Sequence, residues 1–373
     1  MVETIETIGT IRTIETNGGG MSRLKVALLA NLKANAPRFE GMPADQWDDL
    51  DSEKTVNALV EAIRSGGHTC EFLEGDLTLY DHVRAYKPNI CFNICEGHFG
   101  DAREAQAPAM LEMLRIPYTG SKVLTLALAL DKPMTKRILH WHGLPTPAFQ
   151  TFERADDPLD DDLTFPLFAK PSREGTGMGV TARSIVNTEA ELRERVGYIH
   201  ERYKQPALVE HYIAGREVTV GVVGNLQGPV ARHLPVRREE PRIEAGLRFL
   251  PPMEVDLQPY LETDAVYSNR LKVALADQLD YLCPAPLSNE QVDELNWLTA
   301  AVFRVTGALD VSRVDFRLDA NDHWRPYILE INPLPGLSPG TSDLVIEAAA
   351  QDMGHAELVN LILDTALERY GLR

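Results

Sequence analysis

The sequence is poor in cysteine and has no long apolar run. Four cysteines in 373 residues (Cys70, Cys91, Cys95 and Cys283) do not make the disulfide framework of a small secreted domain. The longest clearly apolar run, residues 123–130, is far shorter than the ~20 residues that a membrane-spanning helix needs. These two absences exclude a disulfide-rich scaffold and argue against a membrane protein.

Basic residues are also scarce relative to acidic ones. The chain has 37 Lys+Arg and 55 Asp+Glu, a formal net charge of −18. This balance argues against non-specific binding to nucleic acid or to an anionic membrane, so we expect neither as a partner. The first twenty residues form a Thr/Ile/Glu repeat that ends in glycines and does not resemble a secretory signal. We therefore expect residues 1–20 to be a mobile leader and the protein to be cytoplasmic.

In the N-terminal part the hydrophobic pattern alternates between strands and helices, which favours a parallel sheet with helices on its faces, and a second α/β pattern follows. Strands are predicted at residues 25–30, 70–73, 90–94, 167–170, 311–318 and 327–332 and within 207–223. Helices are predicted at residues 51–66, 105–114, 125–142, 189–203, 290–305, 344–353 and 356–370. Residues 235–286 show no clear period, and so long an irregular segment is more often functional than idle.

Two predicted strands near the C-terminus carry polar side chains at alternating positions. Arg313 and Asp315 are two residues apart in S-R-V-D-F-R-L, and Glu330 and Asn332 are two apart in L-E-I-N-P. Side chains two apart on a strand share a face, so adjacent strands could bring Asp315, Glu330 and Asn332 to one spot. Their oxygens suit Mg²⁺. The alternative is a solvated edge-strand face, although a lone charge in the apolar run around Glu330 is costly unless it is paired or metal-bound.

A lysine and three glycines follow another predicted strand. The segment K-P-S-R-E-G-T-G-M-G begins at Lys170 and ends at Gly179. Glycine-rich backbone can hold a phosphate with its N–H groups while a nearby lysine supplies charge, although turns collect glycine for conformational reasons alone. Glu210 and Glu217 adjoin predicted strands, where carboxylates either bind the amino group and ribose of a nucleotide or are plain turn residues.

Taken together, these elements resemble the ATP-grasp superfamily and, within it, the D-alanine–D-alanine ligase family. The likeness extends from about residue 90 to the C-terminus, in eight motifs that keep the family's order. The motifs are I-P-Y-T-G-S (116–121), L-D-K (130–132), G-L-P-T-P (143–147), K-P-S-R-E-G (170–175), G-R-E-V-T-V (215–220), C-P-A (283–285), R-V-D-F (313–316) and L-E-I-N-P-L-P-G (329–336).

The resemblance implies an α/β fold with an N-terminal Rossmann-like parallel-sheet domain followed by a two-subdomain ATP-grasp fold. We expect the Rossmann-like domain over residues 21–131 and the central ATP-grasp subdomain over 132–206. The C-terminal subdomain is then expected over 207–373, with a mobile loop at about 235–286.

The resemblance also implies a role for individual residues. The implied ATP-binding residues are Lys132, Lys170, Gly175, Thr176, Gly177, Gly179, Glu210, His211, Ile213 and Glu217. The implied metal ligands are Asp315, Glu330 and Asn332, which would hold two Mg²⁺ ions, with Mn²⁺ as a possible substitute. The implied catalytic residues are Lys170, Arg313 at the tetrahedral intermediate, Lys272 of the mobile loop over the γ-phosphate, and Gly336 through its backbone N–H.

The departures from the family pattern fall on the amino-acid side. Glu96 stands where the family usually has histidine, and only acidic residues such as Asp49 lie near the expected ammonium-binding glutamate. Thr341 or Ser342 corresponds to the serine near the C-terminal substrate carboxylate. These four residues are the candidate substrate residues, and their divergence leaves the substrate pair open.

Three hypotheses follow for the function. The first is an ATP-dependent carboxylate–amine ligase of the D-alanine–D-alanine ligase type, which works through an acyl phosphate in peptidoglycan synthesis. The second is an ATP-grasp ligase for other amino acids or carboxylates in natural-product biosynthesis. The third is a nucleotide-binding module without turnover. Small-molecule substrates and ATP are the expected partners, and the family likeness implies a homodimer.

Overall fold

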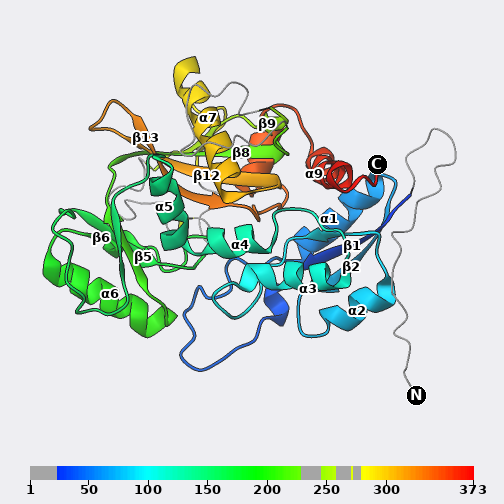
Figure 1. Ribbon diagram of the computed structural model, residues 1–373, viewed down its shortest axis with the longest axis horizontal. Helices are drawn as coiled ribbons and strands as arrows, with labels where there is room; N and C mark the ends of the chain where they lie inside the picture. Colours follow the sequence, from blue (N-terminus) through cyan, green and yellow to red (C-terminus); the bar gives the residue numbers. More distant parts are fainter. Residues whose placement is uncertain (1–22, 228–244, 258–269, 272–278) are drawn as a thin grey trace.

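The computed structural model describes residues 23–227, 245–257, 270–271 and 279–373. It contains one parallel sheet and two antiparallel sheets, with helices packed on them (Figure 1). The predicted leader, residues 1–20, lies outside the described residues. No helix in the described part of the chain is long and apolar enough to cross a membrane.

The N-terminal sheet has the parallel arrangement that the alternating pattern predicted. Strand β1 (Lys25–Ala30) lies between β2 (Thr69–Glu74) and β3 (Ile90–Asn93), and both neighbours run parallel to it. All of β3 and five of the six residues of β1 are buried, as expected for strands covered on both faces. Its helices are α1 (Glu53–Ser65), α2 (Leu79–Tyr86) and α3 (Gln106–Leu114). The predicted N-terminal parallel sheet is therefore confirmed.

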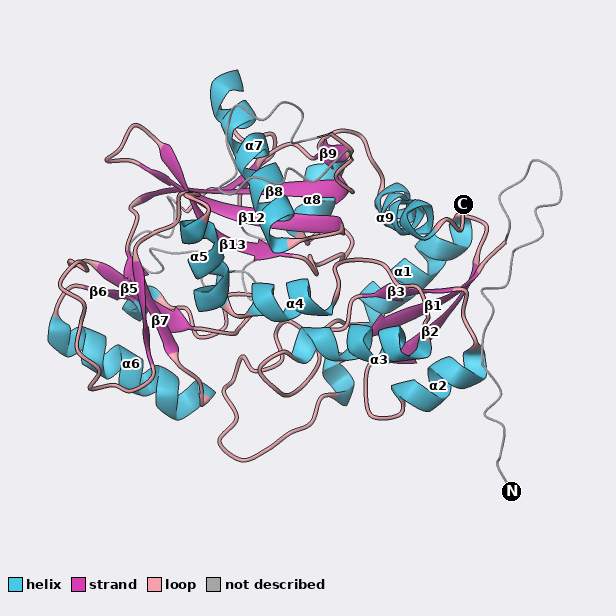
Figure 2. Ribbon diagram, in the orientation of Figure 1, coloured by secondary structure: helices cyan, strands magenta, loops and turns pink. Residues whose placement is uncertain are grey.

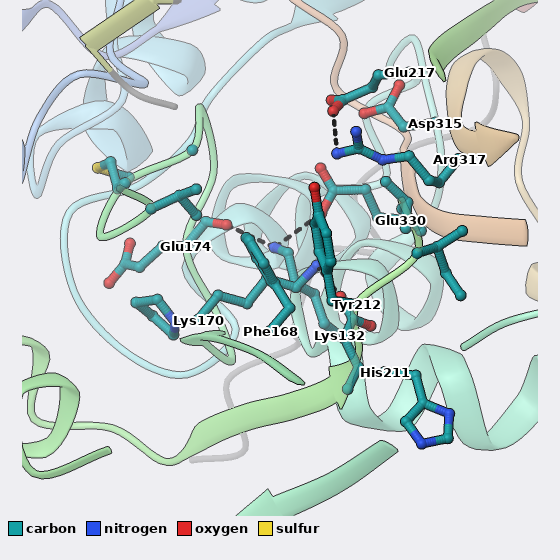
Figure 3. Close-up of a pocket in the computed structure, with 17 residues that line it drawn as sticks. Lys132, Phe168, Lys170, Glu174, His211, Tyr212, Glu217, Asp315, Arg317 and Glu330 are labelled. Atoms are coloured by element: carbon teal, nitrogen blue, oxygen red, sulfur yellow. Dashed lines mark hydrogen bonds and ion pairs between the residues drawn. The ribbon is translucent and has the colours of Figure 1, made fainter. Parts of the chain in front are cut away.

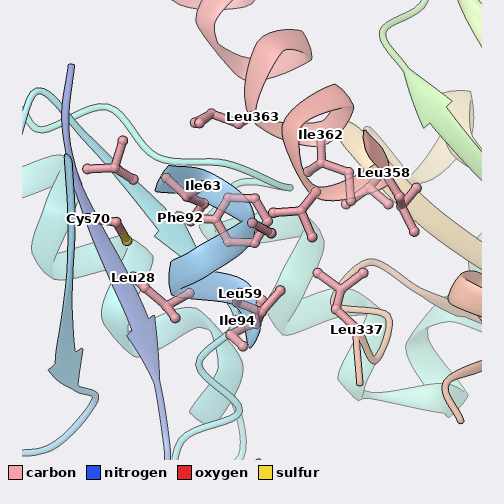
Figure 4. Packing of buried hydrophobic residues seen from close by; sticks show 14 of the residues in the cluster. Leu28, Leu59, Ile63, Cys70, Phe92, Ile94, Leu337, Leu358, Ile362 and Leu363 are labelled. Carbon is pink, nitrogen blue, oxygen red and sulfur yellow. The ribbon is translucent and has the colours of Figure 1, made fainter. Parts of the chain in front are cut away.

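Helix α1 buries the face that its 3.6-residue spacing predicted. Ser52 caps the helix, because its hydroxyl accepts the Thr55 N–H at 3.1 Å. The buried face, which includes Leu59, belongs to one core cluster with Leu358 and Ile362 of α9 (Figure 4). Helix α9 (His355–Tyr370) thus closes the core of the N-terminal domain. The same cluster includes Val223, Val311 and Leu344, so α9 packs against both the N-terminal domain and the C-terminal subdomain.

The central sheet has four antiparallel strands in the order β4-β7-β5-β6. They are β4 (Phe149–Phe152), β5 (Leu167–Pro171), β6 (Ile185–Val186) and β7 (Ala207–His211). Helix α6 (Glu189–Tyr203) covers the outer face of this sheet and has the predicted bounds (Figure 2). Because β7 pairs with both β4 and β5, the sheet extends to His211, and the predicted boundary at residue 206 cuts through it.

The C-terminal sheet has the path β11-β10-β8-β12-β13, with β9 paired to β8. Its long strands are β8 (Gly215–Gly224), β12 (Asp310–Asp319) and β13 (Arg325–Asn332), and α7 (Asn289–Thr306) packs on them. Its short strands are β9 (Leu247–Phe249), β10 (Met253–Val255) and β11 (Tyr281–Leu282). The prediction that residues 235–286 are irregular is wrong for these strands, because two or three residues are too few to show a period.

The residues predicted as one helix, 125–142, form two. Helix α4 (Val123–Leu130) ends at Asp131, which then caps α5 (Lys132–Trp141). The Asp131 carboxylate accepts the Met134 N–H at 3.0 Å, and a proline stands in the first turn of α5. This break places Lys132 at the start of α5, where its backbone N–H donates to the Ser172 carbonyl.

Candidate active site

Two neighbouring cavities meet where the three sheets approach one another. The first, here called the lysine cavity, lies between the central and C-terminal sheets and is lined by both Lys132 and Lys170 (Figure 3). The second, here called the carboxylate cavity, is lined by six carboxylate side chains: Asp49, Glu96, Glu104, Glu174, Glu330 and Asp343. Lys132, Glu174 and Glu330 line both cavities and so form their common wall.

Strands β12 and β13 bring distant polar residues together, as their two-residue spacing predicted. The antiparallel register sets Arg313 opposite Asn332 and Asp315 opposite Glu330. Directly opposed residues point to the same face of a sheet, so the four side chains form one group. The register shifts immediately after Asp315, and such an irregularity locally re-aims side chains.

Asp315 accepts hydrogen bonds on both carboxylate oxygens. Arg313 contacts it in a two-pronged pair, with Nε–Oδ1 at 2.8 Å and Nη2–Oδ2 at 3.0 Å. Thr219 and Asn332 donate to Asp315 at 2.7 and 2.9 Å. Arg313 also pairs with Asp343 at 2.9 Å. Burial acts to lower the pKa of Arg313, but Asp315 and Asp343 hold that pKa well above its ordinary value, so Arg313 is a permanent cation.

The predicted metal ligands fit Mg²⁺ by their chemistry. Asp315, Glu330 and Asn332 offer two carboxylates and one amide oxygen, the hard donors that Mg²⁺ prefers alongside waters. In the structure, cationic side chains lie against both carboxylates: Arg313 against Asp315, and Lys132 Nζ at 3.4 Å from Glu330. Among the described residues, no three His, Cys, Asp or Glu side chains are arranged as a metal site. The protein can therefore supply only part of a coordination shell here.

Lys170 shares a buried carboxylate with a second lysine that sequence reasoning missed. Glu210 lies 2.8 Å from Lys170 Nζ through Oε1 and 2.7 Å from Lys136 Nζ through Oε2. Burial acts to raise the pKa of Glu210, but the two ammonium groups hold that pKa below its ordinary value. Lys136 is one helical turn from Lys132 and three residues before the buried Leu139, a spacing that could have revealed an inward-facing lysine.

Lys132 connects α5 to the glycine-rich loop. Its Nζ donates to the Glu174 carbonyl at 2.6 Å and lies near Glu330, as Figure 3 shows. The loop turns through positive φ angles at Thr176, Gly177 and Gly179. A β-branched residue such as Thr176 rarely adopts positive φ, so this conformation is a feature that other contacts must maintain.

A loop of the N-terminal domain lies against the glycine-rich loop. The Gly179 N–H donates to Asp45 at 2.8 Å, and the Tyr203 hydroxyl donates to the same carboxylate at 2.9 and 3.0 Å. A side chain at Gly175 would contact Asp49 at 3.7 Å. The glycine-rich loop is therefore positioned from both the central sheet and the N-terminal domain.

The far end of the lysine cavity is aromatic and apolar. The rings of Phe168 and Tyr212 stack with centroids 6.4 Å apart, and Ile213 lines the same wall. Glu217 is held by Arg317 at 2.7 Å. The ring of His211 is turned away from the lysines, and its Nε2 accepts the Thr164 N–H at 3.1 Å (Figure 3). A flat base would fit the aromatic end, with Glu217 at its edge.

The carboxylate cavity contains the four candidate substrate residues, together with Gly336. Ser342 accepts the Ser338 N–H at 2.9 Å, and a side chain at Gly336 would approach the Ser342 hydroxyl at 2.8 Å. Arg103, which lies beside this cavity, pairs with Asp49 at 3.1 Å and with Glu174 at 3.2 Å. Sequence reasoning missed Glu104 and Asp343, and the predicted catalytic Lys272 lies outside the described residues.

A buried carboxylate behind Arg313 also escaped sequence reasoning. Glu347 of α8 (Asp343–Ala349) is fully buried, and neither of its carboxylate oxygens has a hydrogen-bond partner among the described residues. A side chain at Gly221 would come within 2.1 Å of its Oε2, so a larger residue there would displace Glu347. Burial raises the pKa of Glu347 well above its ordinary value, although Arg313 acts to lower it.

The fold and this arrangement define a class of protein. A parallel-sheet N-terminal domain, followed by two antiparallel sheets around a lysine-lined cavity with a glycine-rich loop beside it, is the architecture of an ATP-grasp protein. A solved D-alanine–D-alanine ligase of Bacillus anthracis, complexed with ATP, shares this fold with a TM-score of 0.68 at 18% identity, covering 94% of this chain and 99% of that one.

Sequence comparison gives the family within that class. The model described as D-ala D-ala ligase C-terminus matches residues 138–245 and 247–364. A D-alanine–D-alanine ligase of Methylibium petroleiphilum is 35% identical over 283 residues, 74% of this chain and 78% of its own. An uncharacterized protein of Sinorhizobium fredii, y4sG, is 33% identical over 329 residues, 85% of this chain and 88% of its own. The chain belongs to the D-alanine–D-alanine ligase family, whose members are ATP-dependent enzymes that form C–N bonds.

Proposed function

We propose that this protein is an ATP-dependent ligase that joins the carboxylate of one amino acid to the amine of another. The observation that carries this proposal is the common wall of the two cavities, formed by Lys132, Glu174 and Glu330. A nucleotide in the lysine cavity would direct its terminal phosphate at a substrate in the carboxylate cavity. The reacting groups would therefore meet at Lys132 and Glu330, without crossing bulk water.

The lysine cavity suits a nucleoside triphosphate. Adenine would lie against Phe168, Tyr212 and Ile213, and Glu217 would accept the ribose hydroxyls. The phosphates would contact Lys132, Lys170 and the glycine-rich loop around Gly177. Because Glu210 is already neutralised by Lys136 and Lys170, it would position these lysines for the phosphates, with its backbone beside the base.

Magnesium would be held by Asp315, Glu330 and Asn332, and we propose two ions, with Mn²⁺ as a substitute. The donor chemistry supports this, because the two carboxylates face each other across β12 and β13. Bound there, the metal would neutralise charge on the transferring phosphoryl group. In its absence, Arg313 and Lys132 provide the positive charge beside these carboxylates.

The chain's own residues would support two chemical steps. In the first, a carboxylate oxygen attacks the γ-phosphorus, ADP leaves, and Lys132 and Lys170 stabilise the charge on the transferred group. In the second, the amine attacks the acyl carbon, phosphate leaves, and the amine proton passes to a nearby carboxylate. Arg313 and the backbone N–H of Gly336 would stabilise the oxyanion between these steps.

D-alanine–D-alanine ligase activity, as named for the relatives, is the first candidate, and ligation of other amino acids is the second. The presence of Glu96 and Glu104 in the carboxylate cavity favours the second, because these acids add charge that a small neutral side chain does not use. We also propose a cytoplasmic homodimer, which the family likeness supports and which light scattering on the purified protein would test.

One experiment tests the function. Phosphate release is measured with ATP and Mg²⁺ across a panel of D- and L-amino acids, and the products are identified by mass. We expect phosphate release that depends on an acceptor, together with a dipeptide product. Release with D-alanine alone would support the first candidate, and release with other pairs the second. No release with any acceptor, despite ATP binding, would leave a nucleotide-binding module and contradict the proposal.

A further inference from the structure

The carboxylate cavity has an uncompensated acidic region made of Asp49, Glu96, Glu104 and Glu174. These residues come from the loop after β1, the segment after β3 and the glycine-rich loop, and all four line the cavity. The cation that pairs within this group is Arg103, which contacts Asp49 and Glu174. If all are ionised, the region carries a formal excess of three negative charges.

The hydrogen bonds show which of these carboxylates are still available. Both oxygens of Glu174 are occupied, one by Gln205 at 2.6 Å and the other by Arg103. Oδ1 of Asp49 is buried without a hydrogen-bond partner, on a side chain that is only 5% exposed. Glu96 and Glu104 form no hydrogen bond or ion pair with the part of the chain that the structure describes. Three carboxylates therefore present unused acceptors to the cavity.

Such an arrangement is costly without a positively charged ligand. Buried carboxylates need paired cations, and a lone buried charge costs several kcal/mol or takes up a proton. Burial, followed by repulsion from Glu104 and Asp49, raises the pKa of Glu96 well above its ordinary value. Burial also raises the pKa of Glu104 to about 7, although Arg103 and Lys132 act to lower it. A cation in the cavity would relieve this cost directly.

The geometry favours an organic cation over a metal ion. The acidic region is not arranged as a metal site within the described residues. A cavity of about 190 Å³ has room for an extended side chain rather than for a bare ion alone. The α-ammonium of one amino acid would balance one of the three excess charges, and the others call for a further positive group.

We propose that one of the two substrates is a basic amino acid whose side-chain ammonium or guanidinium is bound by Glu96, Glu104 and Oδ1 of Asp49. This inference rests on the proposed ligase function and specifies its substrate class. Charge-assisted hydrogen bonds to these acceptors would fix the side chain and leave the α-carboxyl group free to face Lys132 and Glu330.

The test compares basic amino acids with neutral ones of the same length. Phosphate release is measured for lysine against norleucine and for ornithine against norvaline, in both chiral forms, alone and paired with D-alanine. We expect kcat/KM to be at least about tenfold higher for the basic member of each pair, the size of effect that a buried charge pair gives. Products are identified by mass.

Matched variants then assign the preference to the acidic region. Glu104→Gln should reduce the preference for the basic amino acid about tenfold while the KM for ATP stays within about twofold. Glu104→Asp, which keeps the charge, should restore part of the preference. Asp161→Asn makes the same charge change at an exposed site and should leave the preference intact.

The possible failures can be told apart. A preference for neutral amino acids that Glu104→Gln leaves unchanged overturns this inference and leaves the ligase function standing. If no pair releases phosphate, the proposed ligase function is contradicted. A thermal-shift titration with lysine and ornithine then measures binding to the acidic region independently of turnover. A ligand-induced rise in unfolding temperature that Glu104→Gln abolishes supports the basic ligand, whereas no rise overturns it.

Discussion

The two cavities differ in how their buried charges are balanced. In the lysine cavity, each lining glutamate side chain has a cationic partner or lies at the shared wall: Glu210 faces two lysines, Glu217 faces Arg317, and Glu330 faces Lys132. In the carboxylate cavity, Glu96 and Glu104 face no ion-pair partner among the described residues. The protein thus balances its own charges on one side and leaves them unbalanced on the other.

This difference matches the two proposed tasks of the cavities, which are to bind a triphosphate and to select an amino acid. A triphosphate presents the same charges to every enzyme that binds it, so lysines held by a buried carboxylate can be prepared before it arrives. Under the proposed function, the second cavity would discriminate among amino acids, and unpaired carboxylates discriminate strongly because they are costly unless the correct ligand is present. The sequence departures from the family fall on this second side, at Glu96 and Asp49.

Removing the carboxylate at the common wall should have the largest effect. Glu330→Gln removes a proposed metal ligand and the partner of Lys132, and we expect kcat to fall by about 10³ or more, since a metal clamp contributes several kcal/mol to the transition state. Steady-state phosphate release measures this effect. Asp322→Asn in the exposed turn of the same hairpin is the control and should keep full activity. A Glu330→Gln protein with wild-type turnover would refute the metal assignment.

The balance on the nucleotide side can be broken at Lys136. Lys136→Met leaves Oε2 of Glu210 buried without its cation, and breaking a buried ion pair in this way costs roughly 3 kcal/mol of unfolding free energy. Glu210 would then be neutralised by Lys170 alone, which leaves less positive charge on Lys170 to attract the phosphates. The affinity for a non-hydrolysable ATP analogue should therefore fall about tenfold. Denaturant unfolding and calorimetric titration measure the two effects.

Lys54→Met, at an exposed site on α1, is the matched control for this prediction and should change neither quantity. If Lys136→Met keeps the analogue affinity while losing stability, Lys136 supports only the fold. The Lys170–Glu210 pair would then be sufficient to position the charge that binds the phosphates.

The unpaired carboxylates in and near the carboxylate cavity should make the stability of the protein depend on pH. Burial raises to about 7 the pKa of Glu104 in the carboxylate cavity and that of Asp51, which lies outside the cavity lining two residues after Asp49; their ordinary values are 4.5 and 3.8. The unfolded state therefore releases these protons first, so the stability of the ligand-free protein should fall as pH rises from about 4 to 7 and then level off. Between pH 5.5 and 8 we expect the unfolding temperature to drop by roughly 2–4 °C.

Calorimetry across that pH range checks the expectation. Glu104→Gln should flatten the profile, because the glutamine stays neutral in both states, and Asp51→Asn should flatten it further. An unfolding temperature that rises over this range in the wild type, and equally in both variants, would show that these carboxylates are already balanced in the ligand-free protein.

Regular, periodic elements of the fold could be predicted from the sequence. The apolar spacing of α1 and α6 indicates helices, and the continuous apolar run of β1 indicates a buried strand. Short elements carry too little pattern: α2 buries only Leu79 and Val83, and β9 has three residues. The packing of α9 against the N-terminal domain depends on contacts between the two ends of the chain, which no local pattern shows.

The same distinction holds within the candidate site. Asp315, Glu330 and Asn332 could be predicted to converge because strand geometry fixes which side chains share a face. The acidic region around Arg103 could not, since Asp49 and Glu174 are 54 and 71 residues away from it. Lys136 was missed for another reason: its helical spacing from Leu139 points inward, but a lysine on a helix is usually solvated.

The smallest expected effect concerns the contact that joins the two sides. Asp45, from the loop before α1, accepts hydrogen bonds from the Gly179 N–H of the glycine-rich loop and from the Tyr203 hydroxyl. Tyr203→Phe removes one donor but leaves the Asp45–Gly179 bond in place, so unfolding free energy should fall by about 1 kcal/mol.

Kinetics of the same variant would show whether this contact links the cavities. If Asp45 positions the glycine-rich loop for phosphates, Tyr203→Phe should raise the KM for ATP about twofold, since Asp45 itself is then held by fewer hydrogen bonds. The KM for the amino acids should not move, because Tyr203 lines neither cavity. A change confined to the amino-acid KM would mean that the loop before α1 affects only the carboxylate cavity. The charges of the two cavities would then be independent of each other.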